Sequence, residues 1–189
     1  MLQCAYGTRE RAKKFYKDQV LDHLNTQMID FVRRMEMAFI ATADAAGRAD
    51  CSLRAGSPGF IEVLEPGRIA YPEYRGNGVM ATLGNISENP HIGLLLLDFT
   101  HDVIGLHINA RATIVDDLKL DVRFERGRTP ERWVVAEVEE ADIHCRKHIP
   151  RLAPVGRHRM WGTDDVRTKG GDYFGVRAAG PTGADVSRS

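Results

Sequence analysis

A glycine-rich turn between an expected strand and an expected helix is the first feature of this sequence that could bind a ligand. In the stretch AYPEYRGNGVMATLGNISENP, a strand is expected to end at Tyr71–Pro72 and a helix to begin near Gly78. Such a turn directs free backbone N–H groups and the positive end of the helix dipole at one place, which favours an anion such as phosphate. Arg75 adds a charged donor, and Asn77 tolerates left-handed backbone geometry. The alternative is that RGNG only introduces the helix.

A second polar cluster lies upstream, in CSLRAGSPGF. Ser52, Arg54 and Ser57 surround a break in an expected strand at Gly56 and Pro58. A guanidinium beside two hydroxyl groups is suited to phosphate oxygens, because its planar donors match phosphate geometry. The alternative is that Arg54 is a solvated surface residue.

The motif HCRKH is the third candidate. If the chain turns helical from Asp142, His144 and His148 lie one turn apart, which is a spacing of metal ligands. Cys145 would then project about 100° away from His144, so we predict no metal site. Cys145 as a nucleophile would need a nearby base, and the sequence does not indicate one.

Hydrophobic periodicity predicts the helices that position these residues. The first covers residues 8–23, and the second begins at a cap formed by Asn25 or Thr26. The second helix presents four apolar residues on one face: Met28, Phe31, Val32 and Met35. A short helix over Val79–Ser87 must end by Asn89, since proline disfavours helical geometry in the residue before it.

Short apolar or alternating segments predict strands over residues 37–43, 49–55, 60–64, 68–72, 91–99, 103–115 and 132–143. The segment 91–99 is apolar on both faces, so we expect it in the middle of the sheet. In 103–115, His107, Asn109 and Arg111 share one face, directed at a groove or at water. No pair of carboxylates has a spacing typical of acid–base catalysis. Strands without long helices between them favour an antiparallel barrel or sandwich and exclude a doubly wound parallel sheet.

Composition narrows the function classes. The 189 residues contain 26 basic and 26 acidic residues, without the basic excess of a nucleic-acid binder. The longest apolar run, Ile92 to Leu97, is too short to cross a membrane. Three cysteines form no CxxC pair, and no signal peptide is evident, so we expect a cytoplasmic protein with reduced thiols.

Taken together, MAFIATADAAGRADCSLRAGSPGF, IAYPEYRGNGVMATLGNISENPHIGLLLLDF and IGLHINARATIV resemble the FMN-binding split-barrel family typified by pyridoxamine 5'-phosphate oxidase. The segment EADIHCRKHIPRL resembles a subgroup whose last strand ends in a His-Cys motif. The resemblance implies a mainly β fold with flanking helices: a split antiparallel β-barrel at 37–150, with a helical segment at 1–36 packed on it. Residues 151–189 form an extension rich in glycine, arginine and small residues, and we expect its end to be disordered, as chain ends often are.

The resemblance also implies a homodimer with FMN in a groove between subunits. The cofactor-binding residues that it implies are Ser52 and Arg54 on the phosphate-facing strand, Tyr71, Pro72 and Glu73 beside the flavin ring, Arg75, Gly76, Asn77 and Gly78 at the turn, and His144 and Lys147 as groove walls. Two departures stand out. The Ser-Arg-Lys of the oxidase reads Gly76-Asn77-Gly78 here, and its C-terminal Arg-x-His has no clear match around Arg157–Trp161, which argues against pyridoxamine phosphate oxidation.

The function implied is an FMN-dependent oxidoreductase that transfers hydride through flavin N5 and uses a small organic or nicotinamide-type reductant. Two alternatives remain. One is a non-catalytic protein that stores or carries flavin, and the other is an enzyme of the same barrel that binds deazaflavin or haem.

Overall fold

The computed structural model describes residues 2–119, 129–156, 161, 163, 165 and 171–179. Its helices are α1 (Leu2–Ala5), α2 (Arg9–Gln19), α3 (Thr26–Arg34), α4 (Ala81–Glu88) and α5 (Val176–Ala179), with a 3₁₀ turn η1 (Arg146–His148). Its strands are β1 (Met37–Ala43), β2 (Ala49–Ala55), β3 (Glu62–Glu65), β4 (Arg68–Glu73), β5 (His91–Asp98), β6 (Ile104–Val115) and β7 (Arg132–His144). Each strand predicted from the sequence is present, with ends within two residues of the expected ones.

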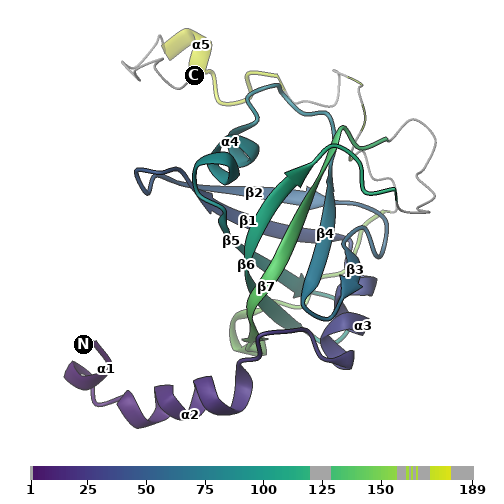
Figure 1. Ribbon diagram of the computed structural model, residues 1–189. Coiled ribbons are helices and arrows are strands. Elements are labelled where there is room, and N and C mark those ends of the chain that lie inside the picture. Colours follow the sequence, from purple (N-terminus) through teal and green to yellow (C-terminus); the bar gives the residue numbers. More distant parts are fainter. Residues whose placement is uncertain are drawn as a thin grey trace.

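The strands form one antiparallel sheet in the order β2-β1-β5-β6-β7-β4-β3. The sheet curls around a core without closing, because its edge strands β2 and β3 do not pair with each other (Figure 1). The predicted mainly β architecture with flanking helices is therefore confirmed.

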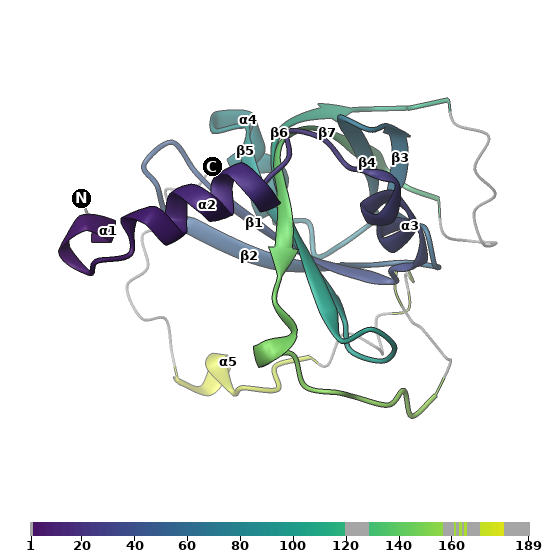
Figure 2. The same ribbon diagram turned by 90° about the horizontal axis from the view of Figure 1, so that it is seen from below.

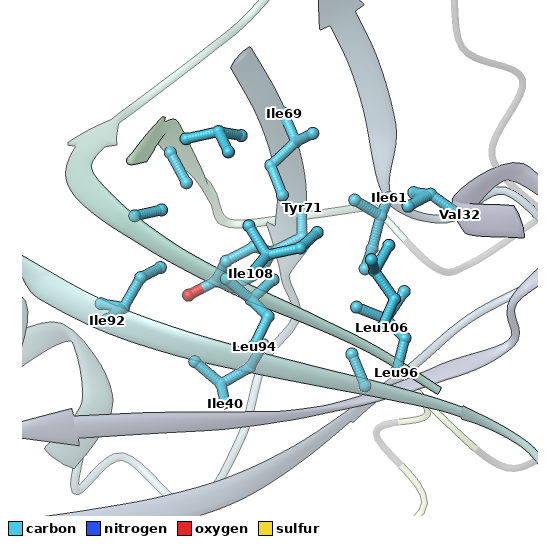
Figure 3. Close-up of a cluster of buried hydrophobic side chains, with 14 of the residues drawn as sticks. Val32, Ile40, Ile61, Ile69, Tyr71, Ile92, Leu94, Leu96, Leu106 and Ile108 are labelled. Carbon is cyan, nitrogen blue, oxygen red and sulfur yellow. The ribbon is translucent and has the colours of Figure 1, made fainter. Parts of the chain in front are cut away.

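The core fills the inside of this curled sheet. Figure 3 shows Ile69 and Tyr71 of β4, Leu94 of β5 and Ile108 of β6 in one cluster of buried apolar side chains. As predicted, β5 lies in the middle of the sheet, between β1 and β6. Its inner residues are buried, whereas on its outer face Gly93, Leu95 and Leu97 are half-buried and His91 is exposed in the single chain. Removing the inner apolar surface from water stabilises the fold.

Only the second of the two predicted N-terminal helices packs on the barrel. Asn25 caps α3 by accepting a hydrogen bond from the Met28 N–H at 3.0 Å, and the predicted apolar face is directed at the core. The first helix was expected to reach residue 23 but ends at Gln19, because Leu21 pairs as an isolated bridge with Ala141 of β7. It buries no residue and extends away from the barrel (Figures 1 and 2).

The helix predicted over 79–87 begins two residues late, at Ala81. The delay arises because Gly78 and Met80 adopt left-handed backbone angles, with φ of 82° and 54°. The helix ends before Asn89, as Pro90 required, and packs on β1, β2 and β6.

In the part of the chain that the structure describes, no helix is both long and apolar enough to span a bilayer. The end of the C-terminal extension, which was expected to be disordered, lies outside the described residues.

Candidate functional site

An ion pair joins the two sides of the opening in the barrel. Nε of Arg54 on β2 donates to Oε1 of Glu73 on β4 at 2.8 Å, although these strands do not pair. The two side chains are 20% and 11% exposed, so the pair is largely shielded from water. Nη1 of Arg54 also donates to the carbonyl of Leu53 at 3.2 Å. Because a guanidinium has five N–H donors, Arg54 retains donors that a ligand could use.

The three neighbouring residues Tyr71, Pro72 and Glu73 are all buried, but they face different ways. The Tyr71 ring lies in the core, where its hydroxyl has no hydrogen-bond partner among the described residues and burial raises its pKa. Burial also raises the pKa of Glu73, and the hydrogen bond and charge of Arg54 oppose that shift. Of the predicted flavin-lining segment, only Glu73 therefore directs its side chain at Arg54.

A cluster of hydroxyl groups lies on the same inward side of β2. Ser52 donates to Oδ2 of Asp50 at 3.0 Å, and Oγ1 of Thr82 lies 3.3 Å from Ser52 Oγ and 3.4 Å from Asp50 Oδ2. Thr82 is buried in the first turn of α4. The sequence identified Ser52 but not Asp50 or Thr82, because only the packing of α4 on β2 brings them together.

The predicted turn is exposed from Arg75 to Gly78 and leads directly into this cluster. Oδ1 of Asn77 accepts a hydrogen bond from the Val79 N–H at 3.0 Å, which leaves the carboxamide nitrogen as the group for a ligand. No side chain caps the first turn of α4 among the described residues. Its free N–H groups and positive dipole end are therefore open to an anion.

The HCRKH motif does not form the helix that a metal-ligand spacing of His144 and His148 would require. Strand β7 continues through His144, as the strand predicted over 132–143 indicated to within one residue, and the 3₁₀ turn η1 follows. Instead, Nδ1 of His144 lies 2.8 Å from Nε2 of His107 on β6, with the rings edge to face. A side chain at Gly105 would collide with His144 Cβ at 2.9 Å, so the glycine makes room for this pair. Lys147 is exposed in η1.

Electrostatics around the histidine pair favour the neutral form of the His107 ring. Desolvation lowers the pKa of His107, the nearby Asp142 opposes this shift, and His144 adds to it. Burial raises the pKa of Asp142. Among the described residues, no group of three or more possible ligands could hold a metal ion. Cys145 is exposed.

Comparison with known proteins identifies the family. The family model described as pyridoxamine 5'-phosphate oxidase matches residues 24–145. The chain belongs to the pyridoxamine 5'-phosphate oxidase family. No curated protein matches it.

Solved structures share the split-barrel fold of this family. A Lactobacillus delbrueckii protein, described as a candidate pyridoxamine 5'-phosphate oxidase, is 20% identical over 65% of this chain and 98% of its own, with a TM-score of 0.50. HupZ of Group A Streptococcus is 17% identical over 69% of this chain and 100% of its own, with a TM-score of 0.49. HutZ of Vibrio cholerae, described as a haem storage protein, is 14% identical over 64% and 93%, with a TM-score of 0.43. At 20% identity the Lactobacillus delbrueckii structure shows the fold alone.

The residues that the family resemblance implied fall into two groups at opposite ends of β7. The first group surrounds Glu73, which pairs with Arg132 at the start of that strand. The second is His144 with Lys147 at its other end. Twelve residue steps of extended strand amount to about 40 Å of chain. Within one copy, the structure does not bring the two groups together.

Proposed function

We propose that this family member is an FMN-dependent oxidoreductase whose cofactor lies at the opening of the split barrel, between two copies of the chain. The observation that carries the proposal is the position of Arg54. It is a partly buried cation with donors to spare, held by Glu73 at the opening, two residues from Ser52 on the same side of β2.

The groups at the opening fit a phosphate ester. Arg54 provides charge-assisted donors, Ser52 and Thr82 provide hydroxyl groups, and the uncapped start of α4 adds backbone N–H groups. Glu73 fixes the guanidinium from one side, so its remaining edge is presented to the ligand. Bound FMN would supply hydride transfer at flavin N5, and no protein nucleophile is required.

The turn of Arg75, Gly76, Asn77 and Gly78 takes the place of the Ser-Arg-Lys of the oxidase. We assign its backbone amides and the Asn77 carboxamide to the phosphate, in partial replacement of the missing cationic side chains. The Tyr71 ring is in the core, so within the segment Tyr71–Glu73 we assign the contact with the cofactor site to Glu73.

The outer face of the sheet supports the proposal of a second copy. Leu53 of β2 is 54% exposed, and it lies in one row with Phe39 of β1 and Leu95 of β5, both half-buried. Covering such a row with another copy removes apolar surface from water. We assign His144 and Lys147 of one copy to the Arg54 site of the other copy, an arrangement that would bring the two groups together.

Subunit complementation tests the shared site. We expect Arg54→Ala/Glu73→Gln and His144→Ala/Lys147→Ala each to weaken FMN binding. After subunit exchange in an equal mixture, about half of the dimers are mixed, and each mixed dimer regains one intact site. Recovery of about a quarter of the high-affinity sites supports the proposal. No recovery in a mixture that mass spectrometry shows to contain mixed dimers would contradict it.

Two alternative functions can be distinguished from the proposed one, the first by its lack of enzymatic activity and the second by its cofactor. A flavin carrier would bind FMN without oxidising a reduced nicotinamide, whereas the proposed oxidoreductase turns it over. A deazaflavin or haem protein is the other possibility, since the first turn of α4 carries no basic residue that would favour a phosphate. The thiols of Cys4, Cys51 and Cys145 are free in the structure, which suits the cytoplasm that we propose as its location.

A further inference from the structure

The first residues of the chain form a projecting arm, defined here as residues 2–21, which contains α1 and α2. The arm lies outside the family match at residues 24–145. It is held at its base, where Leu21 and Ala141 exchange two backbone hydrogen bonds of 3.0 and 2.7 Å. Beyond this anchor, α2 leaves the barrel (Figures 1 and 2).

The arm is not stabilised by its own barrel. Helix α2 has 11 residues and buries none of them. Isolated helices shorter than about 12–15 residues are marginal in water. The arm also exposes aromatic side chains, since Tyr6 is 77% and Tyr16 57% exposed. The Tyr16 ring meets Phe15 edge to face at 6.1 Å. We therefore expect a surface outside the chain's own barrel to cover and stabilise the helix.

The charge of α2 indicates what that surface carries. The helix has five cations and two carboxylates among its residues: Arg9, Arg11, Lys13, Lys14 and Lys17 against Glu10 and Asp18. Only the Lys13–Glu10 pair is formed within the helix, at 3.0 Å. A complementary surface is therefore acidic and about as long as the helix, roughly 16 Å.

Strand β7 presents such a surface. Ala136, Val138 and Ala141 are buried, and a bulge between Val138 and Glu140 shifts the alternation of the strand. In a regular strand Glu139 and Glu140 would face opposite ways. The bulge instead places four acids on the outer side: Glu137, Glu139, Glu140 and Asp142. They span about 17 Å of strand.

The residues beside this acidic row neutralise its negative charge only in part. Glu139 lies 3.3 Å from His91, and Glu140 accepts a hydrogen bond from Asn109 at 3.0 Å. Arg111 is the cross-strand partner of Glu137. Arg68, on the other side of Glu137, pairs with Glu65. The row keeps an excess of negative charge beside the apolar row that we assign to the dimer.

We propose that the arm of one copy lies along the acidic row on β7 of a second copy, so that two arms clamp the homodimer. The arm starts beside β7 of its own chain but points away from it, so a partner related by a two-fold axis can present the same strand to it. Such a contact occurs twice in the dimer. This inference rests on the proposed homodimer and adds a contact that the cofactor site does not require.

Zero-length cross-linking identifies whether the arm on the acidic row of β7 comes from the same chain or from a second copy. Protein with natural isotopes is mixed with uniformly ¹⁵N-labelled protein, allowed to exchange subunits, and treated with a carbodiimide that joins lysine to carboxylate. We expect mixed-isotope links between Lys13, Lys14 or Lys17 and Glu137, Glu139 or Glu140. Links found only within one chain would place the arm on its own barrel and overturn the proposal.

Charge reversal in the full chain provides the energetic test. One variant carries Lys13→Glu, Lys14→Glu and Lys17→Glu, and the other carries Glu137→Lys, Glu139→Lys and Glu140→Lys. We expect each variant to raise the dimer dissociation constant at least about tenfold, since pairs are lost and like charges meet. Mixing the two variants restores both contacts, so the mixed dimer is expected to form with wild-type affinity. The control Arg33→Glu/Lys119→Glu/Arg177→Glu changes charge equally at exposed residues outside the arm, the acidic row and the shared site, and leaves dimerisation unchanged.

The outcomes separate the arm from the dimer itself. If all variants are dimers of unchanged affinity, the arm clamp is wrong while the proposed shared site stands. If the wild type is a monomer, the proposed shared site is wrong, and the arm contact that rests on it is wrong as well. Flotation of the wild type with phosphatidylglycerol vesicles, lost in the arm variant and without links between chains, would assign the arm to a lipid surface and overturn the proposal.

Discussion

Replacing Arg54 with alanine has two consequences that can be measured separately. The first is loss of stability, because the buried Glu73 carboxylate is left without its counter-ion. Breaking a fully buried pair costs about 3–5 kcal/mol. Since a fifth of the Arg54 side chain is exposed, at 20%, we expect about 2–3 kcal/mol. For a chain of this size that corresponds to a fall in Tm of about 4–12 °C.

The loss should depend on pH in a defined direction. Without Arg54, desolvation raises the pKa of Glu73 further, because the two effects of Arg54 that lower it are gone. The folded variant then binds a proton more readily than its unfolded chain does. Its stability deficit relative to wild type is therefore largest near neutral pH and shrinks as the pH falls toward 5.

The second consequence is loss of FMN affinity, which a double variant separates from stability. In Arg54→Ala/Glu73→Gln the buried charge is gone, so most of the stability returns. The charge-assisted bond to phosphate does not return, and we expect affinity to stay about 1.5–3 kcal/mol weaker, or roughly 10–150-fold. Thermal melts and fluorescence titration of FMN measure the two effects. Affinity that recovers together with stability would show that Arg54 only closes the barrel.

Four further predictions concern single residues. Gly78→Val places a β-branched side chain at φ of 82°, so FMN affinity should fall by more than the change in Tm accounts for. Gly76→Ala is the control, because a side chain there has open space and no such φ. Equal losses of FMN affinity in titrations of the two variants would refute the role of the turn. Asp50→Asn removes a negative charge beside Ser52 and should tighten FMN binding by about 1 kcal/mol, or roughly fivefold. Weaker FMN binding in calorimetry would show that the phosphate does not bind beside Ser52. Cys145→Ser should leave flavin content and reductase turnover nearly intact, because flavin chemistry needs no thiolate; complete loss with folding preserved would revive the nucleophile. Because the pKa of His107 is lowered in the folded state, stability should fall as the pH drops below about 6.5. Urea unfolding at several pH values should show that the stability of His107→Gln depends less on pH than that of the wild type. The same dependence of stability on pH in both proteins would show that His107 is not the cause.

The sequence was sufficient for the strands because their periodicity is imposed by burial on one face. Strand β6 alternates between buried Leu106, Ile108 and Ala110 and a polar face, and the same pattern is legible in the residues. Helix ends were harder to predict. The first helix stops at Gln19 because Leu21 pairs with Ala141, more than a hundred residues away in sequence, which local propensity cannot indicate.

Groups of the candidate site could be proposed from the sequence only where neighbours in sequence are also neighbours in space. The turn before α4 and the Ser52–Arg54 segment were identifiable for that reason. Thr82 beside Ser52 and His107 beside His144 depend on packing and register, which no spacing in the sequence encodes. For the HCRKH motif, the sequence left a helical alternative open, and the structure excludes it because strand β7 continues through His144.

The central claim is that this chain holds FMN at the opening of its barrel. The most direct measurement is the absorbance spectrum of the purified protein, repeated after incubation with FMN or with haem and removal of unbound ligand. We expect flavin bands near about 370 and 450 nm with about one FMN per chain, and loss of both in the Arg54→Ala/Glu73→Gln variant. A Soret band after haem incubation with no retained flavin, or flavin retained equally by the variant, would contradict the account.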